Sequence, residues 1–208
     1  MDYKDKNISC FIGIPCGSGL MPAQMVMSLL QLHKPCPCFM SVVERQAIEK
    51  CRNHFVQQAL ASGADYLLMI DDDNPIPPET LELLLEDDKD IVGATILSRN
   101  PNAEGIHDLC AFYSHEHEVE GKILKLYDNI VDFREKGDLH QVDGLGTGCI
   151  LIKRHVLEEM SKAYKHGIFE KTAIDFELTN INGKDYDRRT MSEDCEFSER
   201  AINCGFEV

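Results

Sequence analysis

Short apolar runs alternate with stretches of helical periodicity through roughly the first 100 residues of the chain. The apolar runs predict strands at residues 8–14, 38–43, 66–70 and 91–97. Apolar positions at helical spacing predict helices at residues 22–32, 45–62 and about 78–86. The second of these helices is expected to end at Gly63. Single strands that alternate with helices are typical of parallel βα units, so we expect an α/β fold.

The pattern becomes mixed in the second half of the chain. Short β-like pieces are predicted at residues 111–114, 122–127 and 129–133, and an apolar strand at 149–153. Helices are predicted at residues 155–165 and 193–204. Thr190 and Glu193 have the spacing of a capping box before the last helix. Residues 206–208 resemble the beginning of another strand, so we expect a domain truncated at its C-terminal end, with native chain beyond Val208.

The length of 208 residues suits one domain, which we place at residues 8–208. The first seven residues resemble part of an affinity tag, and residues 1–7 are therefore treated as an N-terminal extension. Hydrophobic residues make up 43% of the chain, which is enough for a substantial core and excludes an intrinsically disordered protein.

The charge balance excludes one class of partner. The chain carries 36 acidic and 21 basic side chains, a formal net charge of −15. Because nucleic-acid binding depends on clustered lysine and arginine, we expect no nucleic-acid partner. A phosphate ligand remains compatible with this charge if a metal ion lies between the phosphate and the protein.

The apolar segments are too short for a membrane protein. No run approaches the roughly 20 residues that cross a bilayer, and the N-terminus lacks the apolar segment of a signal peptide. The cysteines number 9, an odd count, and they lack the paired spacing of zinc sites. We therefore expect a cytoplasmic protein with no membrane segment.

Three adjacent carboxylates, Asp71, Asp72 and Asp73, directly follow the strand predicted at residues 66–70. Open α/β sheets bind ligands at the carboxyl ends of their strands. Alternation along an extended segment places Asp71 and Asp73 on one side and Asp72 on the other. A hard divalent cation such as Mg²⁺ or Mn²⁺ would offset the repulsion between the acids, so we expect Asp71 and Asp73 to share one metal ion.

A solvated acidic turn is the alternative for this acidic triplet, because aspartate side chains often bond to local N–H groups where a strand ends. An EF-hand calcium loop is excluded. Ile76 stands where that loop requires glycine, and a strand precedes the triplet instead of a helix.

A basic residue lies within the apolar stripe of the second predicted helix. The stripe consists of Ile48, Cys51, Phe55 and Ala59. Arg52 falls inside it, and a charge that faces a core needs a partner. An acid of the triplet or a ligand phosphate would serve, and the alternative is a side chain that extends to water.

Two further segments carry candidate chemistry. Gly146, Thr147 and Gly148 lie in a glycine-rich stretch that precedes a strand, whereas a phosphate-binding glycine loop follows one. These glycines permit close backbone approach to a ligand, and an ordinary tight turn explains them equally well. Glu193 and Asp194 open the last helix, where acids either take part in catalysis or complement the helix dipole.

Taken together, these residues resemble a nucleotide-sugar glycosyltransferase of the GT-A fold, closest to family-2-like enzymes. The resemblance covers nearly the whole chain, residues 8–208. The motifs that carry it are, in order, Gly13-Ile14-Pro15, Arg52-Asn53, Gly63-Ala64-Asp65-Tyr66, Asp71-Asp72-Asp73, Gly146-Thr147-Gly148-Cys149-Ile150 and Glu193-Asp194. Each motif is short, and their joint order and spacing make the likeness specific.

The resemblance implies a metal-dependent transfer of sugar from a nucleoside-diphosphate sugar to a hydroxyl of an unidentified glycan, lipid or protein acceptor, with inversion. Nucleotide contacts are implied for Pro15, Arg52, Asn53, Asp71 and Asp72. Asp71 and Asp73 are implied to bind Mn²⁺ or Mg²⁺, and Asp194 to act as general base. Contacts to the donor sugar or acceptor are implied for Arg99, Gly146, Thr147, Gly148 and Glu193. A histidine metal ligand that often follows the last helix in this family is absent, since the chain stops first.

Two other functions remain open. A nucleotidyltransferase would also place acids around a metal and a nucleotide, but it should carry a basic glycine-rich loop after the first strand. Residues 16–22 contain glycines without lysine or arginine. The other alternative is a non-catalytic domain that binds a sugar nucleotide without turnover.

Overall fold

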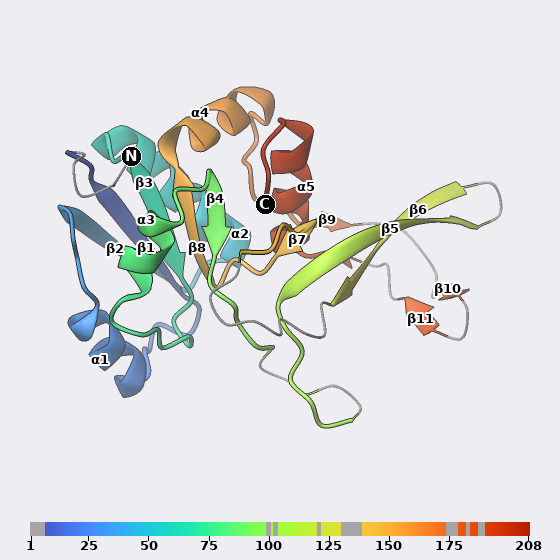
Figure 1. Cartoon of the computed structure of the whole chain (residues 1–208), viewed down its shortest axis with the longest axis horizontal. Coiled ribbons are helices and arrows are strands. Elements are labelled where there is room, and N and C mark those ends of the chain that lie inside the picture. Colours follow the sequence, from blue (N-terminus) through green and yellow to red (C-terminus); the bar gives the residue numbers. More distant parts are fainter. Residues whose placement is uncertain are drawn as a thin grey trace.

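A five-stranded mixed sheet forms the centre of the protein, whose computed structural model describes residues 7–98, 101, 104–119, 122–129, 139–173, 179–181, 184–186 and 190–208. The order across the sheet is β2-β1-β3-β8-β4 (Figure 1). Its strands are β1 (Cys10–Cys16), β2 (Cys38–Glu44), β3 (Tyr66–Ile70), β4 (Ile91–Gly93) and β8 (Cys149–Lys153). β1, β2 and β3 are parallel, whereas β8 is antiparallel to both of its neighbours, β3 and β4. The expected α/β class is confirmed.

Helices cover both faces of this sheet. They are α1 (Ala23–Gln31), α2 (Ile48–Ser62), α3 (Thr80–Glu86), α4 (Arg154–Ala163) and α5 (Glu193–Asn203). α2, α4 and α5 pack on one face, where Phe55 and Phe197 are fully buried. α1 and α3 pack on the other face through Met25 and Leu81. Because both faces are covered, a central strand such as β3 is apolar at every position.

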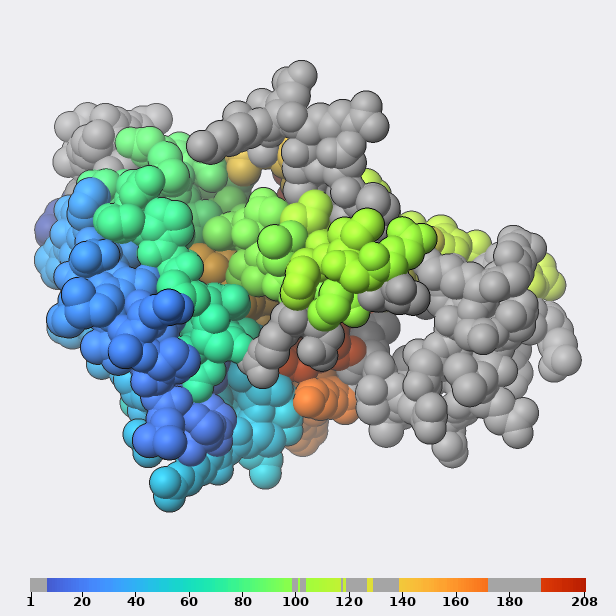
Figure 2. Space-filling model, turned by 90° about the horizontal axis from the view of Figure 1, so that it is seen from below, coloured from blue at the N-terminus to red at the C-terminus, as the bar shows by residue number. Residues whose placement is uncertain are grey.

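A second, smaller sheet has the order β6-β5-β7. Its strands are β5 (Ala111–Val119), β6 (Lys122–Asn129) and β7 (Gly144–Leu145). β5 and β6 form a hairpin that extends away from the central sheet (Figure 1). In the space-filling view, the blue and cyan residues of the first two βα units gather on one side and the yellow-green residues of β5 toward the other (Figure 2).

The remaining strands form two short antiparallel pairs. They are β9 (Thr172–Ala173) with β12 (Thr190–Met191), and β10 (Thr179–Ile181) with β11 (Lys184–Tyr186). Among the helices in the described ranges, none has both the length and the apolar character needed to cross a bilayer.

Two predicted elements are shorter in the structure by three or more residues at one end. The strand predicted at residues 91–97 ends at Gly93, because Gly93 pairs with Ile150 and the partner strand β8 begins one residue before Ile150. The helix predicted from residue 45 begins at Ile48. Arg45 has a positive φ of 54° and its N–H donates to the carbonyl of Cys16, so the chain turns before the helix starts.

Other expectations concerned turns and chain ends. The capping box predicted for Thr190 and Glu193 is wrong, since Thr190 lies in β12 and the hydroxyl of Ser192 accepts the hydrogen bond from the N–H of Cys195. The pieces predicted at 111–114 and 122–127 are longer strands, and Asn129 ends β6, while residues 130–133 of the third piece lie outside the described part.

The two βα units pack closely where α2 crosses β1. A Cβ atom on Gly13 would lie 2.5 Å from Cγ of Phe55, well inside contact distance. Phe55 is fully buried, so its ring has no open space into which to retreat. Glycine at position 13 therefore sets how near α2, and the residues it carries, lie to the sheet.

We expect Gly13→Ala to lower the free energy of unfolding by about 1–3 kcal/mol, because the added methyl group overpacks the core. Gly17→Ala is the matched control, since a Cβ atom there meets nothing within 4 Å. Urea denaturation of both variants measures the difference. Equal stability of the two variants would contradict the close approach of α2 to β1.

Candidate functional site

A buried arginine holds three carboxylates from distant parts of the chain. Arg52 on α2 is 2% exposed. Its Nη1 atom donates to Oε1 of Glu193 at 2.7 Å and to Oδ1 of Asp194 at 2.5 Å. Its Nη2 atom donates to Oδ1 of Asp71 at 3.1 Å. Of the partners left open for Arg52 by the sequence, an acid of the triplet is the one observed. We call Arg52, Asp71, Glu193 and Asp194 the arginine–carboxylate cluster.

Each member of this cluster is placed by a rigid element. Arg52 lies within the buried stripe of α2, so its side chain is directed toward the sheet. Asp71 directly follows β3, and its N–H donates to the carbonyl of Gly148 at 2.8 Å. Glu193 and Asp194 form the first turn of α5, where negative charge is favourable. The cluster thus lies at the carboxyl end of a central strand, the position where open α/β sheets bind ligands.

Burial and charge oppose one another in the cluster. Burial raises the pKa of Asp71, and the attraction of Arg52 works against that rise. Burial and then the charge of Asp194 raise the pKa of Glu193. Burial also disfavours the charged form of Arg52, but Asp194, Asp71 and Glu193 outweigh it and raise its pKa above the ordinary value. Arg52 therefore stays charged, and the single guanidinium faces an excess of negative charge.

One oxygen of Asp194 is held from two sides. The buried hydroxyl of Thr147 donates to Oδ1, which is also the oxygen bound by Arg52. Within the described part of the chain, no hydrogen bond reaches the other oxygen, Oδ2. The side chain of Asp194 is 26% exposed. This carboxylate is fixed in orientation and retains an oxygen that can accept a proton.

A cavity of about 240 Å³ lies beside the cluster. Asp71, Asp73, Asn74 and Asp194 all line it. Asp72 does not, and it raises the pKa of Cys16 at the end of β1, after the larger effect of burial. Asp71 and Asp73 therefore line the cavity and Asp72 does not, as predicted, but residues 72 and 73 form a turn in place of the extended segment on which that prediction was based.

The glycines of the 144–148 stretch allow close approach between protein segments. A Cβ atom on Gly146 would lie 2.6 Å from Cβ of Cys110. One on Gly148 would lie 2.5 Å from Nδ2 of Asn74 and 3.2 Å from Oδ2 of Asp71. Their small size brings the β8 turn against the triplet, a use that the sequence did not distinguish from approach to a ligand.

The shared metal ion predicted for Asp71 and Asp73 stays a prediction. Within the described ranges, no group of three or more histidine, cysteine, aspartate or glutamate side chains is placed to hold a metal. Mg²⁺ commonly uses only one or two carboxylates together with waters and substrate phosphates. Asp71 and Asp73, which line one cavity, match that requirement in type and number.

Three further residues were predicted as nucleotide or donor contacts. Pro15 is buried near the carboxyl end of β1. Asn53 bonds within the protein: its Oδ1 accepts from the N–H of Ile168 at 2.9 Å and its Nδ2 donates to the carbonyl of Phe169 at 2.6 Å. Asn53 thus fixes the loop after α4. Arg99 lies outside the described residues.

The sequence reasoning did not select five residues that line the cavity, namely Asn74, Ile96, Leu97, Ser98 and Cys110. Asn74 directly follows the triplet, so its neighbours could have indicated it. Cys110 comes from the loop before β5, and its N–H donates to the carbonyl of Ile96 at 2.8 Å. No local pattern marks Cys110, because only the tertiary fold brings it to the site.

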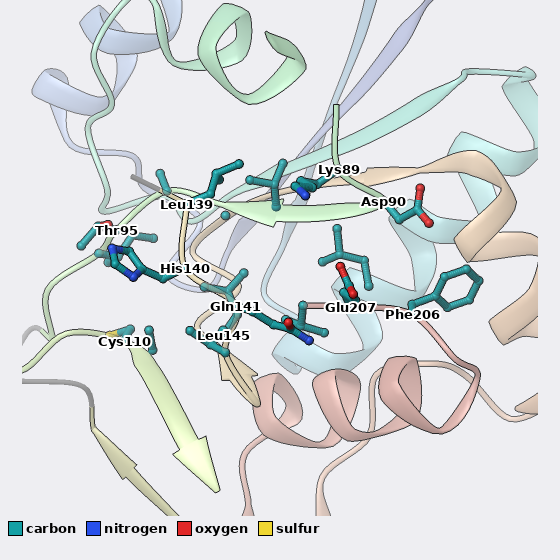
Figure 3. Close-up of a pocket in the computed structure, with 18 of the residues that line it drawn as sticks. Lys89, Asp90, Thr95, Cys110, Leu139, His140, Gln141, Leu145, Phe206 and Glu207 are labelled. Carbon is teal, nitrogen blue, oxygen red and sulfur yellow. The ribbon is translucent and has the colours of Figure 1, made fainter. Parts of the chain in front are cut away.

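A larger cavity of about 910 Å³ lies along β4, between this strand and residues 139–142 and 205–208 (Figure 3). Of the predicted site residues that the structure describes, none lines it. Ile96 and Cys110 line both cavities and form the wall between them. Five of the predicted site residues, Asp71, Asp73, Gly146, Gly148 and Asp194, line the smaller cavity.

No family model matches the chain, and no curated protein matches it. One similar solved structure is titled the crystal structure of A197 from STIV. It shares 17% sequence identity with this chain and has a TM-score of 0.46, over 73% of this chain and 67% of that chain. The site is therefore interpreted from its own residues.

We expect Thr147→Val to lower the free energy of unfolding by about 1.5–3 kcal/mol, because a buried hydrogen bond to a charged group is lost at nearly constant volume. Thr95→Val is the control, since the side chain of Thr95 is exposed, and its effect should stay within about 0.5 kcal/mol. Urea denaturation measures both. A Thr147→Val protein as stable as the control would remove Thr147 from the support of Asp194.

Proposed function

We propose that the protein is a GT-A-fold glycosyltransferase that moves a sugar from a nucleoside-diphosphate sugar to an acceptor hydroxyl. The observation that carries this proposal is Asp194, held by Arg52 and Thr147 beside a cavity that Asp71 and Asp73 also line. The mixed sheet, with parallel β1 to β3 and the antiparallel β8 next to them, is compatible with that fold.

Asp194 is the proposed general base. Its Oδ1 atom is occupied by Arg52 and Thr147, so Oδ2 takes the proton of the acceptor hydroxyl. The acceptor oxygen then forms a bond to the anomeric carbon as the bond from that carbon to the diphosphate breaks. The electron pair leaves with the nucleoside diphosphate, and this single displacement inverts the anomeric configuration.

The donor would lie across the ends of β1 and β3. Arg52 and Asn53 are bonded to protein groups, and the side chain of Arg52 is only 3% exposed. Asp71 is also bonded, but its side chain is 28% exposed, so Pro15, Asp71 and Asp72 are kept as the proposed nucleotide contacts. Asp71 and Asp73 are the residues that would hold a Mn²⁺ or Mg²⁺ ion, whose charge would offset that of the departing diphosphate. The turn of Gly146 to Gly148, together with Glu193, would border the sugar and acceptor.

Release of free UDP or GDP from a panel of nucleotide sugars tests the proposed reaction. A glycosyltransferase releases the diphosphate, slowly with water and faster with a suitable acceptor. A nucleotidyltransferase would instead release pyrophosphate from a nucleoside triphosphate and a sugar phosphate. Donor binding without any release would favour the non-catalytic binding domain.

We expect Asp194→Asn to reduce turnover by about 10²- to 10⁴-fold, because the amide cannot accept the acceptor's proton. The donor dissociation constant should change only a few-fold, since the substituted group acts in the chemical step. Asp194→Glu should recover little, because its carboxylate is displaced by one methylene. Paired measurements of donor affinity and transfer rate test this.

Glu79→Gln is the control for this series, since Glu79 is exposed and its side chain makes no capping bond on α3. Transfer at the wild-type rate by Asp194→Asn would rule out Asp194 as the base. A defect confined to stability would leave Asp194 as part of the α5 start alone.

We expect UDP or GDP to bind more tightly with Mn²⁺ or Mg²⁺, and Asp73→Ala to remove that gain, because the cavity then loses one of its two triplet carboxylates. Calorimetry with and without metal measures the effect. If UDP and GDP bind wild type and Asp73→Ala equally well with and without the metal, Asp73 is not a metal ligand.

A further inference from the structure

The arginine–carboxylate cluster already contains a cation of its own. We propose that the guanidinium of Arg52 takes the place beside Asp71 that a divalent ion would otherwise occupy. The protein without nucleotide therefore binds no divalent ion at this site. Where a diphosphate is present, its oxygens complete a cation site that the protein alone does not offer, and this second part rests on the proposed function.

The geometry of Arg52 carries the first part. Its Nη2 atom lies 3.1 Å from Oδ1 and 3.5 Å from Oδ2 of Asp71, so both carboxylate oxygens face the guanidinium. The side chain of Arg52 is 3% exposed and that of Asp71 is 28% exposed. The pair is therefore poorly screened by water, and the guanidinium has no open route to solvent.

Arg52 is also fixed from its other side. Nη1 is bound by Glu193 and Asp194, which α5 supplies. A rotation of the guanidinium away from Asp71 to admit a metal ion would break these bonds or displace the start of α5. The planar guanidinium is pre-organised for such bonds, so carboxylates on two sides hold it in one orientation.

A divalent ion would compete poorly for Asp71 under these conditions. Mg²⁺ requires six oxygen ligands at about 2.0–2.1 Å, and an ion bound to Asp71 would come close to the charge of Arg52. With Arg52 between Asp71, Glu193 and Asp194, no group of three or more histidine, cysteine, aspartate or glutamate side chains in the described ranges is placed to hold a metal ion. A diphosphate would add oxygen ligands for the ion and negative charge to offset that of Arg52.

Variants of Arg52 should differ from one another in their affinity for a divalent ion. Replacement of the guanidinium by an apolar side chain leaves Asp71, Glu193 and Asp194 close together without a cation. Three neighbouring carboxylates then repel one another and attract a divalent ion. Arg52→Met should therefore gain an affinity that the wild type lacks, whereas Arg52→Lys keeps the positive charge and should not gain it.

The first experiment is a titration of the wild-type protein with Mn²⁺ alone, followed by electron paramagnetic resonance of the free ion. We expect no stoichiometric binding without nucleotide. Binding of one Mn²⁺ ion per protein that Asp71→Asn abolishes would overturn the proposal. The expected result, an absence of Mn²⁺ binding to the wild-type protein, is obtained without any variant.

The second experiment compares melting temperatures with and without Mn²⁺. Arg52→Met is expected to melt lower than wild type and to recover by roughly 2–4 °C or more when Mn²⁺ is added. Wild type and Arg52→Lys should not respond. A folded Arg52→Met protein that ignores Mn²⁺ would contradict the proposal, and if this variant does not fold, the wild-type titration decides.

Nucleotide addition separates this inference from the proposed function. We expect UDP or GDP to bring one Mn²⁺ ion into the wild-type protein. If neither diphosphate binds in the presence of Mn²⁺, the proposed glycosyl transfer fails, while the absence of Mn²⁺ binding without nucleotide still supports the role of Arg52.

Discussion

The structure of the candidate site depends on the burial of one positive charge. A guanidinium inside a protein is tolerated only when hydrogen-bonded anions surround it, and Arg52 obtains them from two elements that are far apart in the sequence. The same bonds hold Asp71 and Asp194 at a short separation, although these carboxylates would otherwise repel. The ion pair therefore shapes the site and contributes to the packing of α5 on the sheet.

The antiparallel β8 is the second constraint. It lies between β3 and β4, so the turn that precedes it meets the end of β3. That meeting is close enough to require glycine at position 148, and it also delivers Thr147 to Asp194. Sheet topology thus explains why a short glycine-rich turn and an acidic triplet, separated by much of the chain, form one site.

Much of this arrangement follows from local sequence patterns. Apolar runs predicted β3 and β8 at their observed bounds. The position of Arg52 in an apolar stripe indicated a charge in need of a partner, and an acid of the triplet was one of the alternatives. The patterns did not predict that Glu193 and Asp194 would be further partners, or that Asn53 would bind the backbone near Phe169. Those contacts join residues more than 100 positions apart, and no periodicity within a single element encodes them.

The span of these contacts has a consequence for how the protein forms. The bond between Arg52 and Asp194 joins residues 142 positions apart. Closing so long a loop costs chain entropy before any contact compensates for it. The charged centre is thus completed only when α5 docks, so assembly of the site requires the long-range packing of this helix on the sheet.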